Sequence, residues 1–144
     1  MALGNVFDIA GSGMNAQSVR LNTTASNLAN AQTASSSIDQ VYRGRHPVFA
    51  AVVNDAMNMN QDAATAGANT GVQVMGIVES DAPLQPRYEP HHPQANEEGY
   101  VYYPNVNVVE EMTNMISASR SFQANVEVMN SAKQMVQRVL TLGQ

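Results

Sequence analysis

Two long rows of apolar residues, each repeating every seven positions, constrain this chain more than any other feature. Apolar residues at this spacing fall on one face of an α-helix. The rows predict one helix from Val6 to about Ala31 and another from Val108 to about Leu142. The members of the two rows are Phe7, Met14, Leu21 and Leu28, and Met115, Phe122, Met129 and Val136.

A strict seven-residue repeat favours a left-handed supercoil, because a straight helix drifts relative to that repeat. The two helices are therefore expected to pair. Periodicity alone leaves two alternatives open, a helical hairpin within one chain and packing against helices of neighbouring molecules. The charge ladders that usually flank a coiled-coil seam are missing, so partner choice would rest on shape and on amide hydrogen bonds.

The second helix has clear signals at both ends. Asn107 can serve as its N-cap, with Glu110 three positions further on as the capping-box partner. Lys133 and Arg138 lie near the other end, where cations complement the helix dipole. Gly143 is a reasonable C-terminal stop.

The middle of the chain has a different character. Short strands are predicted at Val48–Val53, at Val72–Val78 and at Tyr100–Tyr103. The polar stretch Met57–Gly71 is expected to be mobile, and Ala82–Pro93 is predicted to be a turn-rich arm with four prolines. Three short strands bury little on their own, so we expect this β piece to lean on a helix or on a neighbouring subunit.

The expected fold is mainly α, with long N- and C-terminal helices pairing in a coiled-coil-like manner around a small β-rich central insert and flexible loops. Three segments are expected along the chain. Residues 1–37 hold the N-terminal helix, residues 38–104 hold the β-hairpin-like segment with its loop and arm, and residues 105–144 hold the C-terminal helix.

The composition narrows the classes of partner. The net charge is −5 with seven scattered basic residues, which gives no footprint for a nucleic acid. Only 13% of residues are charged, while the chain has 15 Asn and 11 Gln. A surface poor in charge and rich in amides suits contact with other proteins. There is no cysteine, and no apolar run long enough for a transmembrane helix. The N-terminus also lacks the features of a cleavable signal peptide.

Four short motifs could suggest chemistry, and each has a plainer explanation. His91 and His92 are adjacent, and adjacent residues do not comfortably share one tetrahedral metal ion. The Glu110–Glu111 pair is better explained by helix capping. Gly11–Gly13 is not a phosphate-binding loop, because neither a GK[ST] sequence nor a preceding strand accompanies it. The basic cluster Arg43–His46 is better explained as a solvated turn. We therefore expect no enzyme, no cofactor, no metal site and no small-molecule substrate.

Two long strings at opposite ends of the chain resemble a known family. The segment SGMNAQSVRLNTTASNLANAQT, Ser12–Thr33, is similar to the N-terminal signature of flagellar rod and hook axial proteins. The segment Gly99–Met135 closely resembles the FlgC-type branch of flagellar basal-body rod proteins, as do VYRGRHPVF and the TLGQ ending. Small departures include Phe122, where the family commonly has Tyr, and Tyr103 before a proline.

The resemblance implies a structural subunit of the proximal rod, the drive shaft of the bacterial flagellum. Such proteins are exported through the flagellar type III apparatus without a cleaved signal peptide, and they assemble helically into a tube that crosses the periplasm. Implied partners are copies of the chain itself, other rod proteins, and the inner-membrane ring with the export apparatus. The resemblance leaves open whether the surrounding periplasmic ring is also a partner. The terminal segments would be disordered before assembly and become a packed helical pair.

The two apolar rows are the expected assembly interface. Three amides, Asn27, Asn30 and Asn125, are candidates for fixing register, as a polar group in a helical seam can; the alternative for each is simple solvent exposure. A rival function is a helical adaptor or export chaperone that stays in the cytoplasm, and an enzyme is a distant third.

Overall fold

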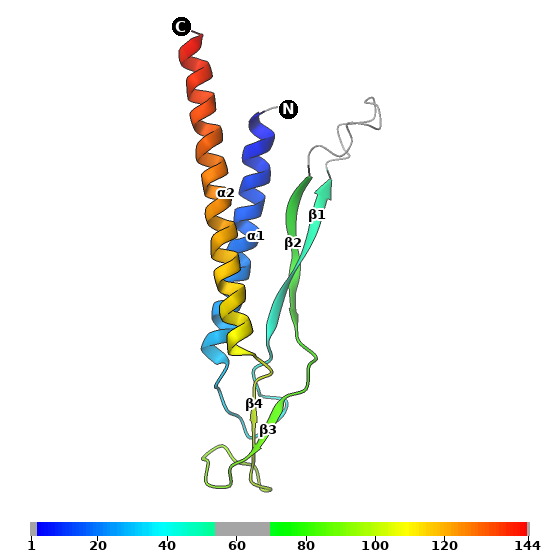
Figure 1. The fold of residues 1–144 in the computed structure, drawn as a ribbon. Helices are drawn as coiled ribbons and strands as arrows, with labels where there is room; N and C mark the ends of the chain where they lie inside the picture. The colour runs from blue at the N-terminus through cyan, green and yellow to red at the C-terminus, as the bar shows by residue number, and fades with distance from the viewer. Residues whose placement is uncertain (1–2, 54–69, 144) are drawn as a thin grey trace. The chain divides into compact units, whose positions relative to one another are not determined.

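The computed structural model describes residues 3–53 and 70–143 and contains two long helices and four strands (Figure 1). In chain order the elements are α1 (Leu3–Asn30), β1 (Arg45–Val53), β2 (Thr70–Glu79), β3 (Gln85–Tyr88), β4 (Tyr100–Tyr103) and α2 (Val108–Leu142). The helices have 28 and 35 residues, so the fold is mainly α, as the sequence predicts. Neither helix of the described part is apolar enough over sufficient length to cross a membrane.

The contacts of the chain divide it into two compact units, which are described separately. Unit 1 comprises Met1–Val19, Val48–Gly76 and Ala118–Gln144. Unit 2 comprises Arg20–Pro47 and Ile77–Ser117, and it contains the whole of β3 and β4. Each unit therefore holds a part of both helices.

The start of α2 follows the predicted capping pattern. The backbone N–H groups of Val109 and Glu110 donate to Asn107 Oδ1 at 3.1 and 3.4 Å. This satisfies two of the donors that the first turn of a helix leaves without an intrahelical partner. The N-cap prediction is confirmed, and α2 begins at Val108 as expected.

The strands confirm three predictions and add a fourth strand. The predicted strands lie within β1, β2 and β4, and β1 pairs with β2 in a two-stranded sheet. The predicted mobile stretch falls outside the described residues from 57 to 69. Within the predicted turn-rich arm Ala82–Pro93, Gln85–Tyr88 forms a fourth strand that was not predicted, β3, which pairs antiparallel with β4.

A proline fits inside β3 because of the hydrogen-bond pattern around it. Pro86 lies opposite Tyr102, and the backbone N–H and C=O of Tyr102 both bond to Ser35, at 2.9 and 3.0 Å. The Pro86–Tyr102 pair is therefore a non-hydrogen-bonded pair of the ladder, where the missing N–H of proline costs no bond.

Asparagine side chains hold unit 2 together. Asn105 Oδ1 accepts the N–H of Gly44 at 2.8 Å, while Asn105 Nδ2 donates to the carbonyls of Ser80 and Ala82 at 3.1 and 2.8 Å. One side chain thus joins the segment before α2 to the residue just before β1 and to residues just after β2. Such bonds replace the apolar core that a unit of this size lacks.

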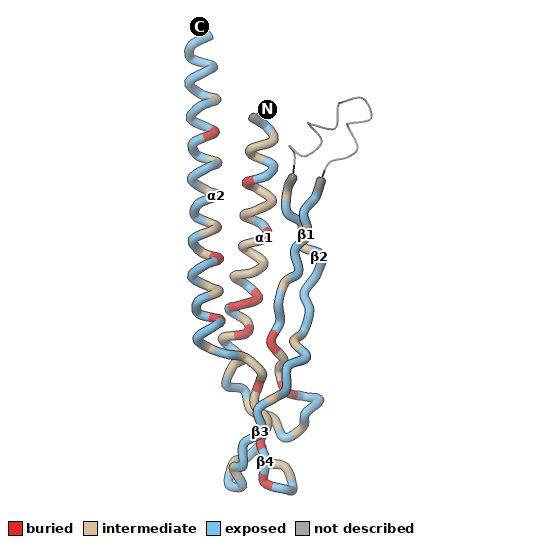
Figure 2. The backbone as a smooth tube through the Cα atoms, turned by 45° about the vertical axis from the view of Figure 1, so that its right-hand side comes forward, coloured by how far each residue is buried: buried red, intermediate tan, exposed pale blue. Residues whose placement is uncertain are grey.

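The core of the described chain is small. The fully buried apolar residues are Ala10, Ala16, Val41, Val101, Ala118 and Ala132, four of them alanine. Figure 2 shows the buried positions of α2 as single points separated by stretches that mix half-buried and exposed residues. Little apolar side-chain volume is therefore buried within the described residues.

Candidate assembly interface

Every member of the two apolar rows is half-buried, neither part of the core nor freely exposed. This holds for Phe7, Met14, Leu21, Leu28, Met115, Phe122, Met129 and Val136. The fully buried positions of the two helices are instead small or polar: Ala10, Ala16, Thr23, Thr24, Asn27, Glu111, Ala118 and Ala132. The apolar rows therefore flank the buried faces of the helices and keep part of their surface free.

In unit 1 the two helices meet over a glycine. A Cβ atom built on Gly13 would lie 2.9 Å from Asn125 Nδ2, closer than real Cβ contacts come. The backbone of α1 and the side chain of Asn125 can approach this closely only because residue 13 has no side chain. The position of Asn125, one of the three predicted register residues, is thus defined by its contact with Gly13.

In unit 2 the helices meet through polar groups. Arg20 Nη2 donates to Asn114 Oδ1 at 2.8 Å, and Glu111, one turn before Asn114 on α2, is buried. Sequence reasoning missed these residues, although a signal was present. Gly13, Arg20 and Asn27 are spaced by seven, as are the residues Glu111, Ala118, Asn125 and Ala132.

Asn27 is the most fully bonded of the predicted register residues. Its Nδ2 donates to the carbonyl of Arg45 at 2.7 Å, and its Oδ1 accepts the N–H of Arg45 at 2.9 Å and the hydroxyl of Tyr42 at 2.8 Å. With 1% of its surface exposed, its amide fixes the start of β1 against α1 within the chain. A role for Asn27 between copies stays a prediction.

Asn30 bonds within its own helix. Its Nδ2 donates to the carbonyl of Ser26 at 2.9 Å, and the residue is half-buried at the end of α1. This bond connects residues one turn apart in α1 and reaches no other element. Its predicted contact with a neighbouring molecule also stays a prediction.

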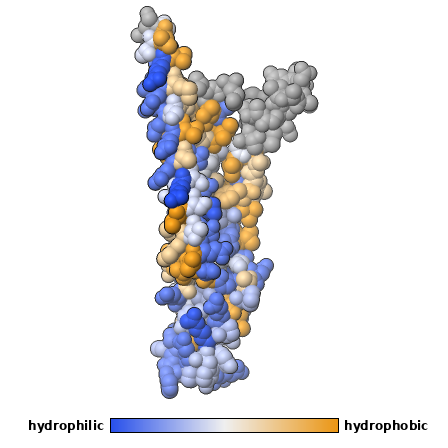
Figure 3. Space-filling view, viewed as in Figure 1, coloured by the Kyte–Doolittle hydropathy of each residue, from blue (hydrophilic) through white to orange (hydrophobic). Residues whose placement is uncertain are grey.

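Large apolar side chains are exposed along the β1–β2 hairpin and along α2. Figure 3 shows them as orange groups on both elements in this view. On the hairpin they are Val48, Phe49, Val52, Val72, Met75, Ile77 and Val78. On α2 they are Val109, Met112, Ile116, Val128, Met135, Val139, Leu140 and Leu142. Exposed apolar surface of this extent marks sites of contact with other proteins.

The motifs considered for chemistry have local roles. His92 Nδ1 accepts the backbone N–H of Gln94 at 3.1 Å, which orders its own loop. Glu110 is exposed while Glu111 is buried, as expected for neighbours on a helix. No group of three or more His, Asp or Glu in residues 3–53 and 70–143 could hold a metal ion.

Together, the fold and this surface define a structural protein with two terminal helices and uncovered apolar rows. Residues 7–34 match the family model described as "Flagella basal body rod protein", and residues 97–142 match "Flagellar basal body rod FlgEFG protein C-terminal". The chain is 51% identical over 144 residues, the full length of both proteins, to the flagellar basal-body rod protein FlgC of Salmonella typhimurium strain LT2.

Two further relatives agree with this similarity. The FlgC protein of Escherichia coli O6:H1 is also 51% identical over the full length of both chains. That of Borreliella burgdorferi is 36% identical over 149 residues, covering 99% of this chain and 98% of the relative. The chain therefore belongs to the FlgC family of flagellar basal-body rod proteins. The family is structural, which confirms the prediction that the chain is not an enzyme.

Proposed function

We propose that this chain is a structural subunit of the proximal rod of the bacterial flagellum. In this proposal it is exported through the flagellar type III apparatus without a cleaved signal peptide. It then assembles helically into a coiled-coil-like tube that transmits torque across the periplasm. Full-length identity to rod proteins supports the location, and the half-buried rows of both helices support the assembly.

The observation that carries the proposal is the uncovered apolar surface of the helices. Isolated helices are marginally stable without packing, and four of the six fully buried apolar residues are alanines, which supply little burial. Burial against neighbouring subunits at about 25 cal/mol per Å² can offset the ordering entropy of the chain. Folding of the terminal helices and assembly are then one coupled process, and a flexible chain enters the export apparatus.

The assembly interface consists of the two apolar rows with Asn27, Asn30 and Asn125 as register residues. The partners in this proposal are copies of the chain, other rod proteins, and the inner-membrane ring with the export apparatus; the periplasmic ring is a further candidate. Head-to-tail contacts that do not close into a ring produce a helical array of such subunits.

Cell fractionation tests the location. The chain, carrying an epitope tag in a loop, is expected in purified basal bodies and in the rod substructure after the rings are stripped off. A chain found in the cytoplasm and missing from basal bodies would overturn the proposal in favour of a cytoplasmic adaptor.

Circular dichroism at 222 nm tests the coupling of folding and assembly. The purified monomer is expected to be less helical than the α1 and α2 of the structure, and its helicity should rise when rods form. A dilute monomer with full helicity would contradict coupled folding while leaving the location intact.

A further inference from the structure

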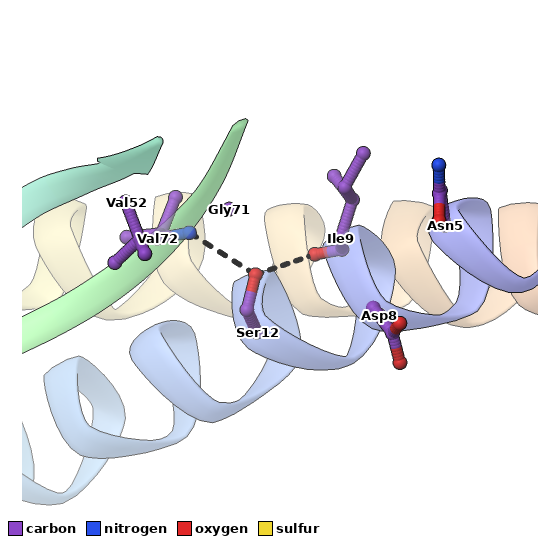
Figure 4. A pocket seen from close by; sticks show the side chains of 7 residues that line it. All are labelled: Asn5, Asp8, Ile9, Ser12, Val52, Gly71 and Val72. Atoms are coloured by element: carbon purple, nitrogen blue, oxygen red, sulfur yellow. Dashed lines mark hydrogen bonds between the residues drawn. The ribbon is translucent and has the colours of Figure 1, made fainter. Parts of the chain in front are cut away.

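Unit 1 contains a preformed cavity of about 220 Å³ between α1 and the β1–β2 hairpin (Figure 4). Its apolar lining residues are Ile9 of α1, Val52 of β1 and Val72 of β2, and its polar ones are Asn5, Asp8 and Ser12, all of α1. An apolar cavity of about 150 Å³ accommodates a benzene molecule, so this one has room for an aliphatic side chain. All three apolar side chains are partly exposed.

A hydrogen bond fixes the two walls of this cavity relative to each other. The hydroxyl of Ser12 accepts the N–H of Val72 at 3.1 Å and donates to the carbonyl of Ile9 at 2.8 Å. A Cβ atom on Gly71 would lie only 3.2 Å from Ser12 Oγ, so the glycine permits this close approach of β2 to α1. Figure 4 shows both bonds of Ser12 beside the cavity.

The last turns of α2 carry exposed apolar side chains on one face. Met135, Val139 and Leu142 are 54%, 62% and 86% exposed. Together with Arg138 they are spaced as i, i+3, i+4 and i+7, so they share one helical face. This face is an apolar stripe with one cation, Arg138, inside it. The cavity joins three apolar side chains to one anion, Asp8, and to two neutral polar side chains.

Within the described residues, α1 reaches only the start of this face, at Met135. In unit 1 the two helices run in opposite directions, and Gly13 lies against Asn125 (Figure 1). Since α1 starts at Leu3, its first residue lies at about the level of Met135, and the turns of α2 beyond that level extend past α1.

The charges at the two surfaces are also unpaired. The only ion pair within residues 3–53 and 70–143 joins Arg45 and Glu79, so neither Asp8 nor Arg138 has one there. We propose that the cavity of one copy receives the Met135–Leu142 face of a second copy, with Arg138 placed beside Asp8. This rests on the proposed function, since it names the neighbouring surface inside a rod. Cavity and occupant are different surfaces, so the contact can repeat from copy to copy, and it forms an open helical array where the rotation between copies does not close a ring.

Charge exchange tests the pairing of Asp8 and Arg138. Asp8→Lys and Arg138→Glu are each expected to reduce swimming in soft agar at least tenfold, and the double variant should recover most of it. The matched control combines Asp8→Lys with Lys133→Glu, the same charge change on another face of α2, and should not recover. Equal behaviour of the two double variants would overturn the proposal.

Cysteine cross-linking tests the contact directly, because the chain has no cysteine of its own. In basal bodies under mild oxidation, a variant with both Ile9→Cys and Val139→Cys should give a ladder of multimers. When one cell expresses a chain with only Ile9→Cys and a chain with only Val139→Cys, the products should be dimers and nothing larger. Replacing Ile9→Cys by Met75→Cys, on exposed β2 surface outside the cavity, should remove the cross-link.

The outcomes separate this proposal from the function it rests on. No cross-link in basal bodies that contain the chain, or a cross-link to a different rod protein, overturns the contact between copies and leaves the rod function standing. Absence of the chain from basal bodies overturns the rod function, and this proposal with it.

Discussion

Units 1 and 2 contain parts of the same two helices, yet they are held together in different ways. In unit 2, the amides of Asn27 and Asn105 make three hydrogen bonds each to groups on other elements. In unit 1, the helices meet over Gly13, and the fully buried apolar residues are Ala10, Ala16, Ala118 and Ala132. Hydrogen bonds with fixed geometry specify a conformation inside one chain, whereas small side chains leave most apolar surface for other contacts.

The difference indicates which unit depends on neighbours. Unit 2 has side-chain hydrogen bonds that join its segments, so we expect it to be ordered in a single copy. Unit 1 has little apolar burial of its own, so its order is expected to come largely from assembly. Tyrosine fluorescence separates the two, because all five tyrosines, Tyr42, Tyr88, Tyr100, Tyr102 and Tyr103, lie in unit 2.

Phe122→Asp is expected to have the largest effect, a complete loss of swimming. Phe122 is a half-buried member of the apolar row in unit 1, and a carboxylate placed in an apolar contact costs several kcal/mol. Soft-agar motility measures the loss, while the tyrosine fluorescence of the monomer should stay unchanged. The control is Gln123→Asp, at the exposed next residue of α2, which should swim. Normal swimming of Phe122→Asp would show that the row is not an assembly surface.

Asn27→Ala is expected to destabilise unit 2 by about 2 kcal/mol, because it removes the bonds to the part-buried N–H and C=O of Arg45, while the hydroxyl of Tyr42 keeps its contact with Ser26 Oγ. Urea unfolding of the monomer, followed by tyrosine fluorescence, measures this change. Asn22→Ala, an exposed asparagine on the same helix, should change stability by less than about 0.5 kcal/mol. If both variants unfold at the same urea concentration, unit 2 does not depend on this amide.

Gly13→Ala is expected to weaken the helix pair of unit 1 by about 1 kcal/mol, because overpacking against Asn125 exceeds the gain in helix propensity. The guanidinium concentration that releases the chain from basal bodies measures the effect. Asn125→Ala in the same chain should relieve it. The control is Gly11→Ala, where no atom lies within 4 Å of the added Cβ. It should raise the guanidinium concentration at which the chain is released. Shifts of the same sign would contradict the close approach at Gly13.

Glu79→Gln is expected to have the smallest effect, less than about 1 kcal/mol, since surface ion pairs contribute little. The Arg45–Glu79 pair is 3.1 Å long, and both side chains are about half exposed. Urea unfolding at low and high salt, followed by tyrosine fluorescence, measures the change in the free energy of unfolding. Asp81→Asn is the control. A loss above about 2 kcal/mol would mean that charge, rather than the asparagines, holds unit 2.

The sequence predicted the elements better than their contacts. The seven-residue rows, the Asn107 cap and the β-branched runs each depend on local spacing, and the helices and three strands they predict are present. The strand β3 was missed because Pro86 argues locally for a turn, and only its pairing with Tyr102 makes a proline harmless there.

The surface of contact between the helices was also not predictable from the apolar row alone. Periodicity shows that Phe122 and Met129 share a face, but it does not show whether the partner helix covers that face or the adjacent one. The adjacent row contains the buried Ala118 and also Asn125, which lies against Gly13 of the partner helix. The Ser12–Val72 bond joins residues sixty positions apart, a separation at which no sequence periodicity operates.

The amide of Asn27 has one more consequence. By meeting both the N–H and the C=O of Arg45, it presents to β1 the same donor and acceptor that an adjacent strand would. An unprotected strand edge recruits further strands and leads to aggregation. A side chain that occupies the first position of this edge therefore blocks strand addition there. This protects a chain that must stay unaggregated until it assembles with other copies.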